Sequence, residues 1–149
     1  MSITFKQMDD PYSEEVFRLT KEGLYPFVDE VFGWDDEFQR QRMREDYKRK
    51  WFYWIIESSI KVGYVCFKPY DQSLQLHLII LAQKFIGNGL GRKVMLAVHE
   101  VAEKDNRDVT LASFKCNKRA VNLYKSLNYE VTEQGEHFLL FRKPYYKQL

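Results

Sequence analysis

Apolar residues recur along this chain with two different periods, and each period predicts an element of secondary structure. Residues 4–8 alternate between polar and apolar, which predicts a short strand. From Ser13 to Leu24, apolar residues at helical spacing follow two acidic residues, which predicts a helix. Three runs of β-branched and aromatic residues within 51–82 are separated by ESSIK and KPYDQ, which predicts a three-stranded meander.

Helix-breaking residues interrupt the pattern between the first helix and this meander. Gly23, Pro26 and Gly33 fall in a stretch dense in aromatic and acidic residues. We therefore expect the first helix to end near Leu24 and a second helix to begin after Gly33, capped by Asp35 or Asp36.

The third run of the meander alternates strictly. The even-numbered residues from Leu74 to Ile80 face one way, and the odd-numbered residues from Gln75 to Leu81 face the other. Apolar residues occur on both faces, so we expect this strand to be largely buried.

The last part of the chain predicts a helix, a strand, a helix and a hairpin. A helical stripe begins at Leu90 and ends near Asp105, the strand covers 108–114, the second helix covers 117–127, and the hairpin turns through Gly135. The length of 149 residues fits a single domain over 1–149.

Composition and charge exclude several classes of protein. The net charge is only +2, and the basic segment 40–50 carries two acids, so we expect no nucleic-acid partner. Cys66 and Cys116 stand apart from any CxxC or His pair, so we expect neither a metal site nor a disulfide framework. No apolar run approaches ~18 residues and the first residues lack a signal-peptide pattern, so we expect a cytoplasmic protein without a membrane segment.

Three glycines at alternate positions, Gly87, Gly89 and Gly91, lie between the buried strand and the helix that begins near Leu90. Glycine lets backbone N–H groups converge on a ligand, and a helix N-terminus attracts anions, so this segment predicts a site for a phosphate group. It matches neither GxGxxG nor GxxxxGK[ST], because Arg92 stands at the deciding position of both. The alternative is a tight turn without a ligand.

A second motif lies on the last predicted helix. Asn117 and Tyr124 are seven residues apart, about two turns, so both are expected on one face beside Ala120 and Leu127. The alternative is a core face with a satisfied hydroxyl.

Together these two segments, LAQKFIGNGLGRKVM and NKRAVNLYKSLNYE, resemble the GNAT superfamily of acetyl-coenzyme A-dependent N-acetyltransferases. The first is similar to the family's pyrophosphate loop [Q/R]-x-x-G-x-[G/A], with Gly89 and Gly91 at the small positions. The second is similar to the family's N-x-x-A-x-x-L-Y-x-x-x-x-[FY] helix. One departure is Ile86, which stands where the family has Gln or Arg.

The resemblance implies an α/β (α+β) domain, with a mixed, mostly antiparallel central sheet of about seven strands flanked by about four helices. Strands four and five would splay apart, and acetyl-CoA would bind as co-substrate without a metal. The implied cofactor-binding residues are Ile79, Ile80, Leu81, Ile86, Gly87, Asn88, Gly89, Leu90, Gly91, Arg92, Asn117 and Ala120.

Acetyl transfer to an amine needs a neutral nucleophile and a proton for the departing thiolate. The resemblance implies Tyr124 as general acid, acting on a thiolate of pKa ~8.5. The base stays open, because His77 in a strand is commonly structural and Glu30, Asp35 and Glu37 are commonly solvated carboxylates. Cys116 lacks a paired activating group, so direct attack is expected rather than a cysteine thioester.

The resemblance implies that the stretch 23–38 lies beside the acceptor pocket. Its aromatic and acidic residues favour a cationic primary amine on a small molecule or peptide. The candidate substrate-binding residues are Tyr25, Glu30, Trp34 and His77. Alternatively, these aromatic residues only anchor two helices. Other open alternatives are transfer of a different acyl group, a non-catalytic CoA-binding sensor or interaction module, and a purely structural domain. A homodimer through the C-terminal strands would suit such a fold.

Overall fold

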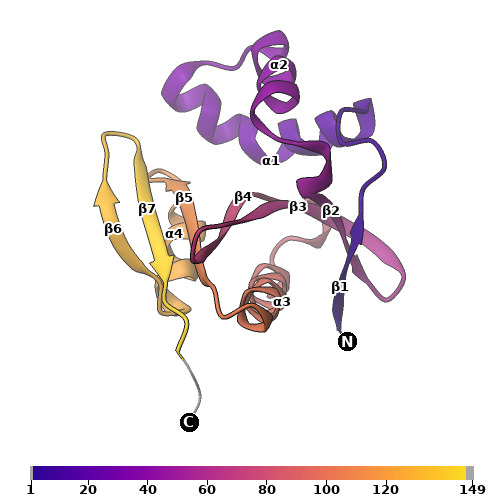
Figure 1. Cartoon of the computed structure of the whole chain (residues 1–149). Coiled ribbons are helices and arrows are strands. Elements are labelled where there is room, and N and C mark those ends of the chain that lie inside the picture. Colours follow the sequence, from indigo (N-terminus) through magenta and orange to yellow (C-terminus); the bar gives the residue numbers. More distant parts are fainter. Residues whose placement is uncertain (1, 147–149) are drawn as a thin grey trace. The chain divides into compact units, whose positions relative to one another are not determined.

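The computed structural model describes residues 2–146, which form a seven-stranded sheet and four α-helices (Figure 1). The strands are β1 (Ile3–Gln7), β2 (Phe52–Glu57), β3 (Ile60–Tyr70), β4 (Ser73–Leu81), β5 (Asp108–Phe114), β6 (Glu130–Gln134) and β7 (Phe138–Lys143). The helices are α1 (Glu14–Phe32), α2 (Asp36–Asp46), α3 (Leu90–Lys104) and α4 (Lys118–Ser126), with short 3₁₀ helices η1 (Arg49–Trp51) and η2 (Gln83–Phe85).

The strand order is β1-β2-β3-β4-β5-β7-β6. β4 pairs with β5 in parallel, whereas β1 with β2, β2 with β3, β5 with β7, and β6 with β7 pair antiparallel. The expected mixed, mostly antiparallel sheet with four helices is therefore confirmed. The parallel ladder joins Ser73–Leu76 to Asp108–Leu111. The splay of these strands beyond Leu76 stays a prediction.

The chain divides into two compact units that alternate along the sequence. The first comprises the described residues up to Cys66 together with Leu78–Leu90, and the second comprises Phe67–His77 together with the described residues from Gly91 onward. β3 and β4 each contribute residues to both units.

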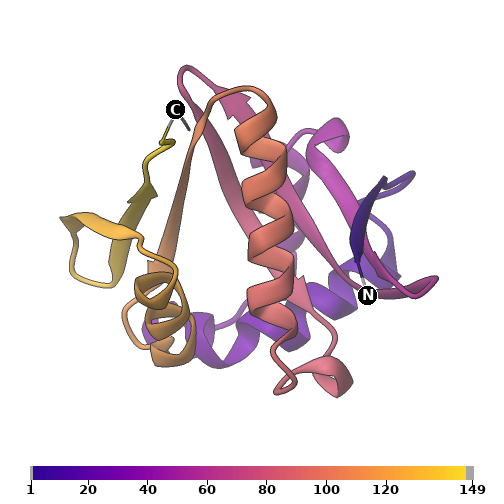
Figure 2. The same cartoon turned by 90° about the horizontal axis from the view of Figure 1, so that it is seen from below.

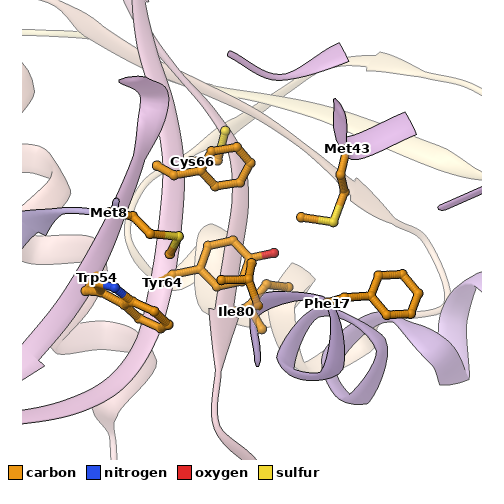
Figure 3. Packing of buried hydrophobic residues seen from close by; sticks show 9 residues of the cluster. Met8, Phe17, Met43, Trp54, Tyr64, Cys66 and Ile80 are labelled. Atoms are coloured by element: carbon orange, nitrogen blue, oxygen red, sulfur yellow. The ribbon is translucent and has the colours of Figure 1, made fainter. Parts of the chain in front are cut away.

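The first unit has an aromatic core between α1, α2 and the strands (Figure 3). Its buried members are Met8, Val16, Phe17, Met43, Phe52, Trp54, Tyr64, Cys66 and Ile80. The hydroxyl groups of Tyr64 and Thr20 share a hydrogen bond inside this core, and Thr20 Oγ1 also donates to the Val16 carbonyl at 2.7 Å. The buried polar atoms of this pair are thus satisfied, and burial raises the pKa of Tyr64.

Helix α1 is longer than the sequence pattern predicts. The prediction that it ends near Leu24 is wrong, because the helix continues through Gly23 and Pro26 to Phe32 and Gly33 caps it, with the Gly33 N–H donating to Asp29 O. Two features of the fold explain this continuation.

Gly23 lies where α1 packs closely on β4, because a Cβ on it would lie 3.2 Å from Ile80 Cγ2 and would require that side chain to shift. Pro26 has no N–H to donate to the Glu22 carbonyl. Gln83 Nε2 from η2 donates to that carbonyl instead, at 3.1 Å. A contact distant in sequence therefore stabilises a helix that local signals would end.

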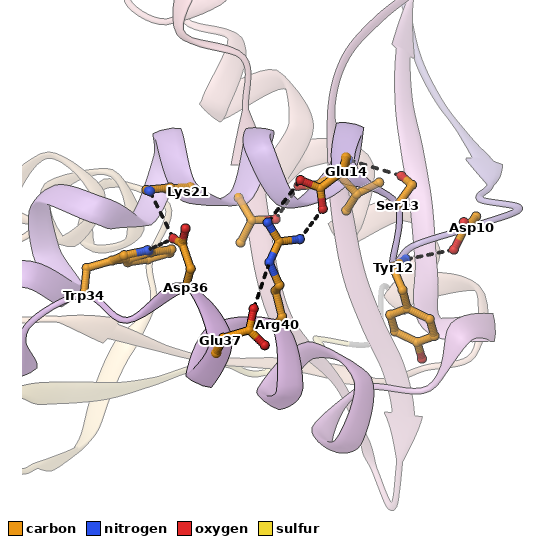
Figure 4. Close-up of polar contacts among 11 residues, drawn as sticks. Asp10, Tyr12, Ser13, Glu14, Lys21, Trp34, Asp36, Glu37 and Arg40 are labelled. Atoms are coloured by element: carbon orange, nitrogen blue, oxygen red, sulfur yellow. Dashed lines mark hydrogen bonds and ion pairs between the residues drawn. The ribbon is translucent and has the colours of Figure 1, made fainter.

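Helix α2 begins as predicted. Asp35 is its N-cap, and the carboxylate accepts a hydrogen bond from the Phe38 N–H at 2.9 Å. Arg40 on α2 forms a bidentate ion pair with Glu14 on α1, and its guanidinium carbon lies 3.8 Å from the centre of the Phe17 ring (Figure 4).

The second unit contains β5, β7 and β6 side by side, with α4 packed beside β7 (Figure 2). The predicted strand 108–114 is confirmed as β5, and the hairpin turns through Gly135, whose N–H donates to Phe138 O at 2.9 Å. The predicted helices match α3 and α4 to within two residues at each end.

Candidate active site

The glycine loop between η2 and α3 has a backbone conformation that favours glycine. Gly87 and Gly89 have φ angles of 101° and 75°, in the left-handed region. A Cβ at Gly89 would meet nothing within 4 Å, so the space beside its backbone is open. Within the described part of the chain, the N–H groups of Gly87, Asn88 and Gly89 donate no hydrogen bond.

These features fit an anionic ligand. Three backbone donors without partners directly precede α3, whose N-terminus carries the positive end of the helix dipole. Ile86 lies at the C-cap of η2, is 36% exposed, and offers no polar side-chain group. The site would therefore hold a phosphate through main-chain groups, without the side chain that the family has at this position.

Arg92 in the first turn of α3 is held by a neighbouring helix. Its Nη2 donates to Ser126 Oγ at 2.9 Å, and Ser126 Oγ donates to Leu123 O at 2.7 Å. The guanidinium of Arg92 is thus tied to the C-terminal turn of α4.

The end of β4 lies very close to β3 within the first unit. A Cβ on Gly63 would clash with the Ile80 carbonyl oxygen and lie 2.9 Å from Leu81 Cα, and Ala82 N donates to Val62 O at 2.9 Å. Ile80 is buried, whereas Ile79 and Leu81 are half-buried. Gly63 is therefore the residue that lets β3 approach the predicted pantetheine-binding strand.

Asn117 and Tyr124 have different positions on α4. Asn117 is the N-cap, and its Oδ1 accepts from the Ala120 N–H at 3.2 Å. Tyr124 is only 6% exposed, with its ring centre 5.7 Å from that of Tyr129 and 5.6 Å from that of Phe141. Burial raises the pKa of Tyr124 to about 12, so the phenol is protonated at neutral pH. No described residue forms a hydrogen bond with its hydroxyl.

His99 on α3 was not predicted as a functional residue. Its Nε2 lies 2.7 Å from the Tyr129 hydroxyl, and the two side chains are 7% and 5% exposed. Burial, and to a smaller extent the charge of Lys143, lowers the pKa of His99 to about 4, so the ring is neutral at pH 7. The sequence does show a histidine within the apolar stripe of α3, which could have indicated a buried polar group. Its hydrogen-bond partner, however, lies thirty residues further along the chain.

Two predicted substrate-binding residues do come together, but around a cation of the chain itself. The ring centres of Tyr25 and Trp34 lie 5.7 Å apart, and Lys21 Nζ lies 6.0 Å and 5.9 Å from them. Lys21 Nζ also lies 3.0 Å from Asp36 Oδ1, which accepts a hydrogen bond from Trp34 Nε1 at 2.6 Å (Figure 4). We call Tyr25, Trp34 and Asp36 the cation site. Sequence reasoning found its two aromatic residues and missed its occupant, Lys21.

The other candidates for recognition and proton removal have different surroundings. Glu30 is exposed and lies outside the cation site. Asp35 caps α2, and Glu37 lies 3.9 Å from Arg40, so both carboxylates have structural contacts. His77 on β4 is half-buried, and burial, together with the charge of Lys68, lowers its pKa.

Neither metal ligation nor a disulfide is indicated in the described residues. Among residues 2–146, no group of three or more His, Cys, Asp or Glu side chains is arranged to hold a metal ion. Cys66 is buried and Cys116 half-buried, and neither forms a disulfide bond. None of the described helices is long and apolar enough to cross a membrane.

The sequence profile of the acetyltransferase (GNAT) family matches residues 14–129, which include the glycine loop and α4. The chain therefore belongs to the GNAT acetyltransferase family. A search of curated protein sequences found no match.

Solved structures share this fold over almost the whole chain. The PaiA N-acetyltransferase from Thermoplasma acidophilum, crystallised with coenzyme A, is 15% identical with a TM-score of 0.75, covering 97% of this chain and 100% of its own. The protein PH1933 from Pyrococcus horikoshii OT3 is 18% identical with a TM-score of 0.74, covering 99% and 100%. An acetyltransferase from Thermus thermophilus is 16% identical with a TM-score of 0.71, covering 97% of each chain.

Proposed function

We propose that this protein, as a single domain, is an N-acetyltransferase that transfers an acetyl group from acetyl-CoA directly to a primary amine. The observation that carries the proposal is the glycine loop, where three unpaired N–H groups and two left-handed glycines precede α3. This arrangement suits a pyrophosphate. Family membership and the coenzyme A bound to the PaiA structure support acetyl-CoA as the molecule that carries it.

Residues 86–92 would hold the pyrophosphate, and the backbone of Ile79–Leu81 would pair with the pantetheine arm. Acetyl-CoA, when bound, supplies the acetyl group and the leaving thiol. Asn117 Oδ1 already caps α4, so its contribution to binding would come from the amide nitrogen, which that bond does not use.

Tyr124 would donate a hydrogen bond to the leaving sulfur. Its pKa of about 12 makes it a weaker acid than a thiol of pKa ~8.5, so it stabilises the thiolate first as a hydrogen-bond donor. Any proton it gives to sulfur is replaced by the proton that the attacking nitrogen loses as the amide forms. The amine, with a pKa of ~10.4, must also lose a proton before attack, and no side chain is assigned to that step.

For the acceptor, we propose a primary amine that carries positive charge. The cation site combines two aromatic rings with a carboxylate, which is the chemistry that binds an ammonium group. Because Lys21 fills this site, a cationic acceptor would have to displace its ammonium from Asp36. Glu30 and His77 remain further candidates for acceptor contacts.

The test is isothermal titration of acetyl-CoA into the wild-type protein, Gly89→Ala and Gly33→Ala. Gly33 is a matched control, since it has φ 79° and open space where a Cβ would be added, like Gly89 with φ 75°. Each variant places a Cβ on a residue with a positive φ, so each strains the backbone. Only Gly89→Ala puts a methyl group where the phosphate would approach. The loss of one charge-assisted hydrogen bond, about 1.5–3 kcal/mol, raises the Kd about tenfold or more.

If Gly89→Ala and Gly33→Ala bind acetyl-CoA with equal Kd, the glycine loop is not part of the binding site. No heat of binding to a folded wild type would overturn the acetyltransferase proposal. Turnover is then measured by thiol release with a panel of primary amines. Binding without turnover on any amine would favour a CoA-binding sensor instead.

A further inference from the structure

Tyr129, three residues beyond the end of α4, is folded back onto the ring of Tyr124. α4 ends in a Schellman motif, in which Tyr129 N donates to Tyr124 O at 3.0 Å and Asn128 N donates to Lys125 O at 3.1 Å. Asn128 adopts the left-handed conformation that this motif requires, with φ 69°. The motif places the ring of Tyr129 against that of Tyr124, with a centre-to-centre distance of 5.7 Å.

The far end of the Tyr129 ring is anchored by α3. Its hydroxyl lies 2.7 Å from His99 Nε2, and both groups are buried away from solvent. A buried hydroxyl and a buried imidazole nitrogen each lose water on folding, so each depends on the other for a partner. The hydrogen bond therefore fixes where the Tyr129 ring lies, more strictly than apolar packing would.

The hydroxyl of Tyr124 has no comparable anchor. Its ring lies between Tyr129 and Phe141, and no described residue bonds to the hydroxyl itself. The position of that hydroxyl therefore follows from the packing of the Tyr124 ring, and the rings of Tyr129 and Phe141 are two of its contacts. The Tyr129 ring is itself fixed by the hydrogen bond between its hydroxyl and His99.

We propose that His99 and Tyr129 are positioning residues that aim the Tyr124 hydroxyl, with the His99–Tyr129 hydrogen bond acting through the ring of Tyr129. This inference rests on the proposed function, because it assumes that Tyr124 stabilises the leaving thiolate. An apolar pair at 99 and 129 would fill the same space but would leave the Tyr129 ring free to shift along its contact with Tyr124.

The test compares Tyr129→Phe with Tyr64→Phe. Each variant removes one buried tyrosine hydroxyl that forms a side-chain hydrogen bond, with His99 and with Thr20 respectively. Tyr64 belongs to the core of the first unit and has no part in the proposed site. In Tyr129→Phe, kcat should fall about tenfold while KM for acetyl-CoA stays unchanged, and Tyr64→Phe should keep the wild-type kcat.

A double-variant cycle separates positioning from general loss of structure. Tyr124→Phe alone should lower kcat about a hundredfold or more. Adding Tyr129→Phe to it should cause no further loss, because the hydroxyl that Tyr129 positions is already absent. His99→Gln, which keeps a hydrogen-bonding group near Nε2, should retain more activity than His99→Phe. A full additional loss in the double variant, or equal losses in the two His99 variants, would overturn the inference.

A second readout does not depend on turnover. In protein labelled at the tyrosine rings, NMR line shapes report how fast the Tyr124 ring flips by half a turn about its Cβ–Cγ bond, and this rate depends on how tightly its neighbours pack against the ring. The flip rate should rise several-fold in Tyr129→Phe and stay unchanged in Tyr64→Phe, and an unchanged rate in Tyr129→Phe would overturn the inference. If Tyr124→Phe itself keeps the wild-type kcat, the role of Tyr124 in the proposed function fails, and the positioning role fails with it. If the wild-type protein binds acetyl-CoA but acetylates no amine, the role of Tyr124 and the positioning role likewise both fail.

Discussion

The buried histidine of α3 should make the stability of this protein depend on pH. Burial lowers the pKa of His99 from 6.5 to about 4, so the unfolded chain takes up a proton on this ring before the folded chain does. Between these two pKa values the unfolded state binds more protons, and the free energy of unfolding therefore falls as the pH falls. The effect is absent above pH 6.5. By pH 5 it reaches at most about 2 kcal/mol, from a total of about 3 kcal/mol for the whole shift.

Urea denaturation followed by tryptophan fluorescence, at pH 7 and at pH 5, measures this difference. His99→Gln is the control, because it keeps every carboxylate that also titrates in this range and removes only the imidazole. We expect the wild-type protein to lose about 2 kcal/mol more than His99→Gln between the two pH values. An equal loss in both proteins would refute the claim that His99 is kept neutral by burial.

Three further predictions follow from single contacts in the first unit. Gly63→Ala should lower the free energy of unfolding by about 2–3 kcal/mol, because the new Cβ would clash with the Ile80 carbonyl. Urea denaturation measures this loss, and an unchanged stability would show that β3 can move away from β4. Gln83→Leu should cost about 1 kcal/mol and speed amide hydrogen exchange in α1, because the Glu22 carbonyl loses its donor; unchanged exchange would mean that water replaces it. Lys21→Met should lower KM for a cationic amine and leave KM for acetyl-CoA unchanged, because it removes the ammonium that competes for the cation site. An unchanged KM for the amine would mean that the acceptor binds elsewhere.

Sequence reasoning was most successful where a local pattern carries the information. The glycine run before α3 and the place of Tyr124 on α4 follow from short motifs, because both motifs lie within one stretch of chain. The strands of the meander follow from β-branched and aromatic runs between turn residues, a signal that depends only on neighbouring residues.

The errors came from contacts between residues far apart in sequence. The end of α1 was misplaced because Gly23 and Pro26 usually stop a helix, whereas here Gly23 lies close to Ile80 and Gln83 supplies the hydrogen bond that Pro26 cannot donate. His99 forms its hydrogen bond with Tyr129, thirty residues away, and no local sequence pattern predicts that pairing.

The alternation of the two units along the sequence has a consequence for synthesis of the chain. A nascent chain that has emerged only as far as Cys66 lacks Ile80, one of the buried residues in the core between α1 and β3. The first unit is complete only when the ribosome has released Leu90, and by then Phe67–His77 of the second unit has emerged as well. No single cut in the chain yields one whole unit as a fragment, so neither half can be produced alone by truncation.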